Sequence, residues 1–145
     1  MKIITALLII FTTTCFAEVA PYQNEIDGFF KSLEVNKPAQ ALDDLFKSNP
    51  WIKNNSDPIK QLELKFGNVV SMVGEYCGYD YLCETMIKDR LVHITYLAYY
   101  ERQPLKVTFT FYKPKDTWRV QSFSYYDDFL EEIKNMSKDK LQQMD

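Results

Sequence analysis

The chain has 145 residues, of which 46% are hydrophobic and 15% aromatic, and it carries 17 Lys and Arg against 20 Asp and Glu. This mildly acidic balance, without a basic cluster, argues against a nucleic-acid-binding protein, because nucleic acid needs a focused positive patch. The aromatic content is sufficient for a hydrophobic core without metal or disulfide support. Composition therefore indicates one ordinary globular domain and names no reaction.

Residues 1–17 have the pattern of a cleavable export signal. Lys2 precedes an apolar stretch far shorter than the ~20 residues that span a bilayer. Small residues at Cys15 and Ala17 predict cleavage after Ala17, which leaves a single domain over 18–145 in the periplasm or outside the cell, without membrane insertion. The alternative is a lipoprotein anchored at Cys15, but the threonines before it form a poor lipid-attachment motif.

Three helices are expected ahead of the sheet. The first spans Tyr22–Leu33, and the second begins at Pro38, a residue suited to the first turn, and ends before Asn49. The third is capped by Ser56 or Asp57 and runs at helical spacing until a glycine at position 74. Between the last two helices, Trp51 and Ile52 are expected to pack beneath the helices.

Strand periodicity dominates the second half of the chain. Glu75–Ile87, rich in tyrosine, is expected to be a strand with a bulge at Gly78. From Leu91 to Asp127, apolar and polar residues alternate with breaks at 101–104 and 113–117, which predicts three further strands. An N-cap signal at Asp127-Asp128 then begins a C-terminal helix that extends to about Lys140. The predicted fold class is α+β: three N-terminal helices packed on a curved four-stranded antiparallel meander, followed by a short C-terminal helix.

Several short motifs carry a resemblance to a known superfamily. They are Gly74-Glu75-Tyr76, Gly78-Tyr79, Tyr100-Glu101-Arg102-Gln103-Pro104-Leu105 and Phe111-Tyr112-Lys113-Pro114 before Trp118. With this order of elements, the chain resembles the nuclear-transport-factor-2-like (NTF2-like, cystatin-like cone) superfamily over roughly residues 26–127, and more narrowly the small exported bacterial proteins of that fold without assigned activity. The superfamily includes isomerases, dehydratases, ligand binders and dimerisation modules, so the resemblance constrains function weakly.

Strand parity predicts which side chains face the helices. If Tyr100 pairs with Leu105, the alternate apolar residues of the first two meander strands share the inner face, and an even-length loop at Pro114 adds Trp118, Val120, Ser122, Ser124 and Tyr126. An aromatic pocket for a small apolar ligand would then be lined by Tyr76, Tyr79, Tyr96, Tyr100 and Trp118. The alternative is that these rings simply fill the core.

The opposite face of the sheet is the second candidate surface. It is expected to present Leu97, Tyr99, Tyr112, Phe123 and Tyr125, a set of large side chains typical of a partner surface. Sheet faces often form homodimers in the superfamily that this chain resembles, so a homodimer through this face is one expectation. The alternative is that the C-terminal helix folds back and covers the face with Leu130, Ile133 and Met136.

No catalytic residue is assigned. The predicted inner face has no carboxylate or histidine, so acid–base chemistry would require Glu75, Asp80 or a helix carboxylate to reach inside. His93, the single histidine, falls on the outer face by parity. We therefore expect a non-catalytic binding or dimerisation module; the alternatives are a small-molecule isomerase, dehydratase or hydrolase, and an accessory domain of an envelope assembly.

Two cysteines follow the export signal, Cys77 and Cys83. An oxidising compartment favours a disulfide between them. Six residues of straight strand, however, separate Cα atoms by ~20 Å, against the ~4.4–6.8 Å that a disulfide needs, so both states stay open. The pair lacks the nearby ligands for a metal site, and no cofactor is expected.

Overall fold

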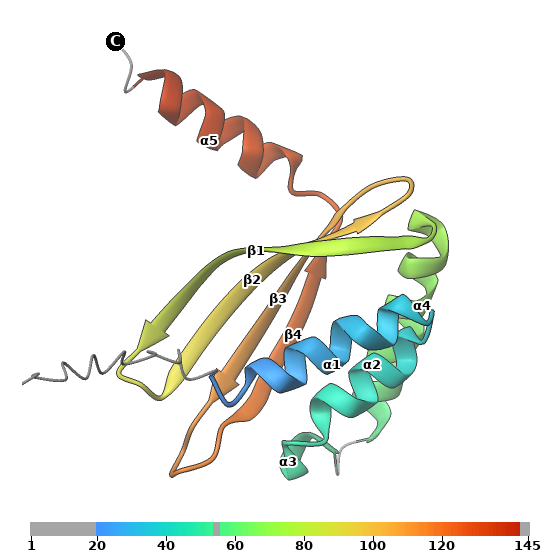
Figure 1. The fold of residues 1–145 in the computed structure, drawn as a ribbon, viewed down its shortest axis with the longest axis vertical. Coiled ribbons are helices and arrows are strands. Elements are labelled where there is room, and N and C mark those ends of the chain that lie inside the picture. The colour runs from blue at the N-terminus through green and yellow to red at the C-terminus, as the bar shows by residue number, and fades with distance from the viewer. Residues whose placement is uncertain (1–19, 54–55, 143–145) are drawn as a thin grey trace, which may run out of the picture.

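The structure is a computed structural model that describes residues 20–53 and 56–142; the predicted export signal lies outside the described residues. The elements along the chain are α1 (Gln23–Glu34), α2 (Pro38–Phe46), α3 (Pro50–Lys53), α4 (Ser56–Val73), β1 (Tyr76–Ile87), β2 (Leu91–Tyr100), β3 (Leu105–Tyr112), β4 (Arg119–Tyr126) and α5 (Leu130–Gln142). The four strands form one antiparallel sheet in the order β1-β2-β3-β4. Figure 1 shows α1, α2 and α4 gathered on one face of this curved sheet, as the predicted fold class requires.

The core lies between α1 and the sheet. Apolar residues recur along α1 at three- and four-residue spacing, and Ile26, Phe29, Phe30 and Leu33 are all buried. They meet the inner face of β2 and β3, whose alternate residues are buried as parity predicted. Phe29 and Phe109 pack edge to face with ring centroids 5.2 Å apart, which fixes the helix against the middle of the sheet.

The segment between α2 and α4 differs from its prediction. Asn49 is buried, and its amide donates to the carbonyl of Val120 at 2.7 Å while its side-chain oxygen accepts from the backbone N–H of Trp51 at 3.1 Å. The side chain thus begins the one-turn helix α3 and ties it to β4. This turn leaves the Trp51 ring 78% exposed, so the expectation that it packs beneath the helices is wrong, whereas Ile52 does pack against the core.

The strand register differs from the prediction in two places. Leu105 lies opposite Ala98 and not Tyr100; because this shift is two residues, every side chain keeps its predicted face. In β4, Ser122 pairs with Thr110 and Val120 pairs with Phe111, so the chain contains one extra residue, Gln121, at a bulge.

The bulge reverses the faces of the residues that follow it. Phe123 lies opposite Phe109, is 7% exposed and packs on Phe66 and Phe29, and Tyr125 packs on Phe66 at 5.2 Å between centroids. Assigning Phe123 and Tyr125 to the outer partner surface is therefore wrong. The predicted inner positions Ser122, Ser124 and Tyr126 fall on the outer face instead.

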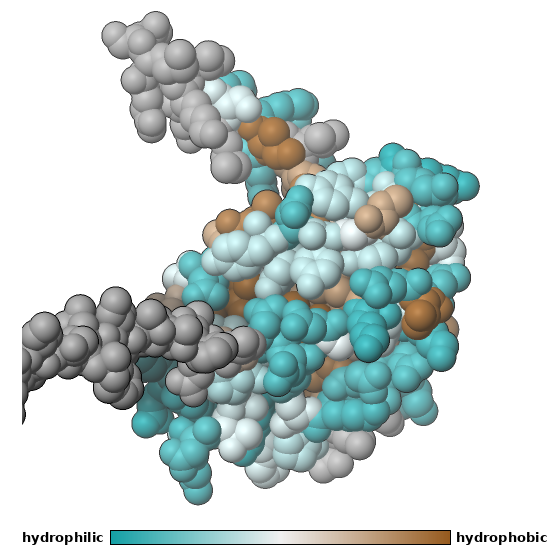
Figure 2. Space-filling model, viewed as in Figure 1, coloured by the Kyte–Doolittle hydropathy of each residue, from teal (hydrophilic) through white to brown (hydrophobic). Residues whose placement is uncertain are grey.

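The C-terminal helix leaves the body of the molecule. Figure 1 shows α5 pointing away from the sheet, and Figure 2 shows apolar surface along its side. Ile133 is exposed, and Glu132 forms an ion pair with Lys106 of β3 near the base of the helix. The alternative in which this helix covers the outer sheet face is therefore wrong for Ile133; the side chains of Leu130 and Met136 lie outside the described set. Among the described helices, none has the length and apolarity to cross a membrane.

Candidate functional site

The predicted tyrosines gather where α1 meets β1. Tyr76 and Tyr100 are cross-strand partners whose rings meet edge to face with centroids 5.5 Å apart. Tyr79 stacks on Phe30 of α1 and meets Tyr96 edge to face at 5.6 Å. These four predicted pocket residues therefore form one cluster, called here the tyrosine cluster.

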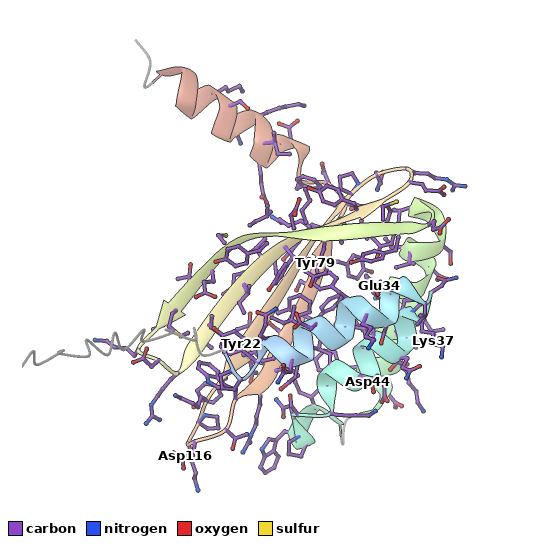
Figure 3. All side chains as sticks on the ribbon, viewed as in Figure 1. Tyr22, Glu34, Lys37, Asp44, Tyr79 and Asp116 are labelled. Atoms are coloured by element: carbon purple, nitrogen blue, oxygen red, sulfur yellow. The ribbon has the colours of Figure 1, made fainter. Side chains whose placement is uncertain are left out.

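The fifth predicted pocket residue lies elsewhere. Trp118 meets Tyr22 edge to face at 5.2 Å, and the ammonium of Lys113 lies 5.1 Å from the indole centroid. Figure 3 places Tyr22 at the start of α1 and Glu34 at its other end, beside the cluster. The prediction that Trp118 joins the tyrosines in one pocket is therefore not met, because β4 crosses beneath the opposite end of α1.

The hydroxyl groups divide the tyrosine cluster into two kinds. The Tyr96 hydroxyl is within 3.3 Å of the Gln23 side-chain amide. In contrast, the hydroxyls of Tyr76 and Tyr100 are buried without a hydrogen-bond partner. Burial raises the pKa of both groups well above the ordinary tyrosine value, so both stay protonated donors. A buried donor without an acceptor costs about 1–3 kcal/mol, which makes these two groups receptive to a ligand acceptor.

Tyr76 also lines a pocket of about 420 Å³ between the end of α1, the end of α4 and the start of β1. The other lining residues are Leu33, Glu34, Asn36, Pro38, Val70, Ser71, Gly74 and Glu75. Leu33 and Val70 supply apolar contact, while Glu34 and Glu75 are the charged members of this lining. The charge of Glu34 is a minor contributor, after burial and the neighbouring tyrosines, to the raised pKa of Tyr76. The pocket therefore combines apolar and acidic surface beside Tyr76, whose own hydroxyl is buried.

The backbone around Gly74 fixes the shape of this pocket. Gly74 has φ +94°, which turns the chain from α4 into β1, and a Cβ there would lie only 3.1 Å from the Glu101 Cβ. The Glu101 N–H donates to the Glu75 carbonyl at 3.0 Å, and the Arg102 N–H donates to the Val73 carbonyl at 2.9 Å. The β2–β3 turn thus holds the end of α4 beside Tyr76. This contact brings a helix end next to Tyr76, which is the one member of the predicted pocket set that lines this cavity.

Of the carboxylates predicted for an enzyme, the two on β1 do not reach the interior, whereas one on a helix is partly buried. Glu75 and Asp80 are both exposed, and Asp80 accepts a 2.8 Å hydrogen bond from the Tyr99 hydroxyl. A helix carboxylate, Glu25 of α1, is partly buried: one of its oxygens has no hydrogen-bond partner, and burial raises its pKa despite a hydrogen bond from Ser48. Glu25 lies about 13 Å along α1 from Glu34, away from the tyrosine cluster, and none of the three pockets described here includes it.

His93 lies on the outer face, as predicted, and its Nδ1 is 2.9 Å from the Thr110 hydroxyl. With Phe123 and Tyr125 turned inward, the outer face retains Tyr99 and Tyr112 as exposed rings and Leu97 as a half-buried side chain. A shallow pocket of about 570 Å³ on this side is lined by Leu82, Cys83, His93, Thr95, Lys106, Thr108, Tyr126 and Glu132. This surface is more polar than the predicted partner surface.

Cys77 and Cys83 both lie in β1 and are exposed free thiols in the structure. The bulge predicted at Gly78 is present, and the register shifts again between Tyr81 and Cys83. Neither irregularity folds the strand back on itself. Within residues 20–53 and 56–142, no group of three or more His, Cys, Asp and Glu residues is arranged to hold a metal ion.

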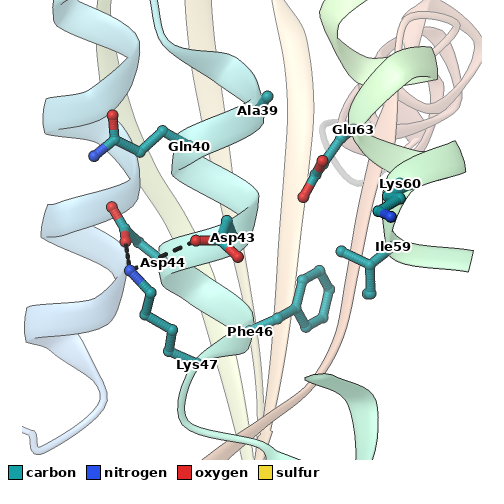
Figure 4. A pocket seen from close by; sticks show the side chains of 9 residues that line it. All are labelled: Ala39, Gln40, Asp43, Asp44, Phe46, Lys47, Ile59, Lys60 and Glu63. Atoms are coloured by element: carbon teal, nitrogen blue, oxygen red, sulfur yellow. Dashed lines mark hydrogen bonds and ion pairs between the residues drawn. The ribbon is translucent and has the colours of Figure 1, made fainter. Parts of the chain in front are cut away.

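A third pocket, of about 490 Å³, lies between α2 and α4 (Figure 4). The carboxylates of Asp43 and Glu63 extend from the two helices over an apolar floor. Lys47 forms an ion pair with Asp44 and lies 3.6 Å from Asp43, and burial raises the pKa of Glu63. Because basic side chains already accompany these carboxylates, we assign this pocket no ligand.

Sequence reasoning missed Glu34 and Ser71 as pocket-lining residues. Both are polar residues on helix faces that carry no motif, and only the meeting of two helix ends brings them to Tyr76. Glu34 did carry a usable signal, since it lies four residues after Phe30 on the same side of α1.

Comparison with known proteins supports the fold and assigns no activity. No protein-family profile matches the chain, and no curated protein matches it. Among solved structures, a Campylobacter jejuni protein described as an NTF2-like transpeptidase superposes with a TM-score of 0.51 and 16% sequence identity, over 70% of this chain and 97% of that chain. The chain therefore has an NTF2-like α+β fold, as the resemblance implied; at this identity the similarity shows the fold alone.

Proposed function

We propose that this protein is an exported, non-catalytic binding module that holds a small, largely apolar molecule in the pocket beside Tyr76. The single observation that carries the proposal is that Tyr76, whose buried hydroxyl lacks an acceptor, lines a pocket of about 420 Å³. A ligand carbonyl or ether oxygen would supply the missing acceptor, and apolar atoms would rest against Leu33 and Val70.

The charge of the lining narrows the ligand class. Glu34 and Glu75 line the pocket, and its lining set includes neither Lys nor Arg. An anionic ligand would be repelled, so the proposed ligand is neutral or cationic. A ketone, lactone or ether with an apolar ring would suit both the Tyr76 donor and the two carboxylates of the lining.

Native mass spectrometry and ligand-observed NMR test this proposal. We expect cyclohexanone and δ-valerolactone to bind, cyclohexanecarboxylate to bind much more weakly, and Tyr76→Phe to weaken ketone binding several-fold. Tyr112→Phe, which removes an exposed hydroxyl on the outer face, is the matched control and should leave binding unchanged. Equal binding by wild type and Tyr76→Phe, or no binding by any probe, would contradict the proposal.

The same native spectrum tests a homodimer through the outer face as a separate proposal. Of the predicted partner surface, three residues support this dimer: Leu97, Tyr99 and Tyr112. The other two, Phe123 and Tyr125 of β4, pack inward. A monomer at all concentrations would reject the dimer and leave the ligand proposal standing.

A further inference from the structure

The free side of β1 combines two features of a docking edge. In the sheet order β1-β2-β3-β4, β1 is an edge strand, and no described strand pairs with its second side. Every residue from Tyr79 to Arg90 is exposed, and large apolar side chains are among them: Tyr81 at 53%, Leu82 at 49%, Met86 at 40% and Ile87 at 53%. Unpaired backbone groups beside exposed apolar side chains can template the addition of another strand.

The usual protection of an edge strand is incomplete in the last segment of β1, residues 83–87, where Glu84 is the one charged side chain. Edge strands commonly carry Lys or Pro, or are twisted by bulges. Between Tyr76 and Ile87, β1 contains neither lysine nor proline. Its register shifts lie at Cys77, between Tyr76 and Gly78, and at Leu82; from Cys83 to Ile87 its pairing with β2 is continuous. This last segment is regular enough to accept a further strand.

The charges of β1 favour a basic partner over a second copy of this chain. Asp80 and Glu84 are the charged residues of the strand, and Asp80 already accepts a hydrogen bond from Tyr99. Within residues 83–87 a second copy would bring another Glu84 and no cation, because Lys88 and Arg90 lie in the turn beyond the strand, and like charges on adjacent strands are destabilising. A Lys or Arg opposite Glu84 would instead form a favourable cross-strand pair.

The neighbours of Glu84 specify the rest of the partner. Tyr81, Glu84 and Met86 lie opposite the buried residues Tyr96, Ile94 and Val92, so they share the inner face of the sheet. An added strand would place a basic side chain at Glu84 and apolar side chains next to Tyr81 and Met86. We propose that β1 binds an extended, basic segment of a partner protein by strand addition along Cys83–Ile87. This surface is separate from the ligand pocket at Tyr76.

Fluorescence anisotropy with two labelled heptapeptides tests the proposal on the folded protein. The probes are Thr-Val-Thr-Lys-Thr-Val-Thr and the same peptide with Glu in place of Lys. We expect the Lys peptide to bind and to slow amide hydrogen exchange across Cys83–Ile87. Glu84→Lys should weaken the Lys peptide about tenfold and allow the Glu peptide to bind, because the cross-strand charge pair is reversed.

Asp116→Lys is the matched control, since it makes the same charge change at an exposed position in the β3–β4 turn (Figure 3). If Asp116→Lys weakened binding of the Lys peptide as much as Glu84→Lys does, the peptide would be attracted by the net charge of the protein alone, and the proposal would be overturned. Absence of binding by the Lys peptide would also overturn it. Without peptide, amide hydrogen exchange across residues 83–87 should not depend on protein concentration. Slower exchange at higher protein concentration would mean that a second copy of this chain occupies the edge, and would overturn the proposal.

Discussion

Phe30 of α1 and Tyr79 of β1 stack face to face, with ring centroids 3.8 Å apart and ring planes 6° from parallel. This contact joins the first helix to the edge strand, and Phe30 also meets Tyr96 edge to face at 5.2 Å. The stack thus connects the buried core to the exposed strand that we propose as a docking edge.

Phe30→Ala tests how strongly this stack and its surroundings hold α1. The side chain is almost fully buried, so we expect a loss of about 3–5 kcal/mol in the free energy of unfolding, measured with urea. Val35→Ala, at an exposed site just beyond α1, should change stability by less than about 0.5 kcal/mol. Similar small effects for both variants would mean that α1 is not packed on the sheet as described.

Phe123 and Tyr112 distinguish the observed register of β4 from the predicted one. Phe123 packs among Phe29, Phe66 and Phe109, so Phe123→Ala should cost about 3–5 kcal/mol. Tyr112→Ala, on the outer face, should cost less than about 1 kcal/mol. If both substitutions were mild, Phe123 would face outward, and the bulge at Gln121 would be wrong.

Gly67 and Gly78 should respond to alanine in opposite directions. Gly67 lies within α4 with open space where a Cβ would project, so Gly67→Ala should stabilise the protein by about 0.5–1 kcal/mol. Gly78 also has space, but its φ is +132°, so Gly78→Ala should cost about 1–3 kcal/mol. Thermal unfolding of the two variants shows whether each substitution raises or lowers stability. No change in stability for Gly78→Ala would argue against the bulge at this position.

Glu25 predicts a pH dependence of stability. Burial raises its pKa in the folded state, so the folded protein binds the proton more tightly than the unfolded chain does. The contribution of Glu25 to the free energy of unfolding is therefore fully present below its pKa in the unfolded chain, about 4.3. It is lost as the pH rises through its pKa in the folded protein. Glu25→Gln should therefore gain in melting temperature relative to wild type as the pH rises above about 4.3.

Glu131→Gln, which makes the same substitution at an exposed position in α5, is the control for Glu25→Gln and should not reproduce its gain in melting temperature. A Glu25→Gln variant that tracks wild type across the same range would show that the Glu25 carboxyl is solvated like any surface acid.

The thiols of Cys77 and Cys83 should both react in the native protein. They are exposed and lie six positions apart on one extended strand. We expect iodoacetamide to modify both cysteines in protein purified without reductant, as read from the intact mass. Protein that resists modification and is lighter by two hydrogens would mean that the strand folds back to form a disulfide.

Patterns in the sequence were sufficient to predict α1, α2, α4 and α5, the meander and the inward faces of β2 and β3, but not the one-turn helix α3. Amphipathic spacing in α1 and alternation in β2 each bury one face because only one face can leave water, and that preference is readable locally. The bulge at Gly78 was also readable, because glycine tolerates the backbone conformation that a bulge needs. The residues of β4 gave no such signal, since both alternating sets after Val120 include an aromatic side chain.

Tertiary structure decided the rest. The bulge at Gln121 turned Phe123 and Tyr125 inward because Phe29 and Phe66 offered them a dry surface. The crossing of α1 over the sheet separated Trp118 from the tyrosine cluster, and the meeting of two helix ends brought Glu34 to Tyr76. The sequence by itself determined which residues could be buried, because side-chain chemistry is local; only the packed chain decided which of them meet, because contacts between distant segments depend on register and helix placement.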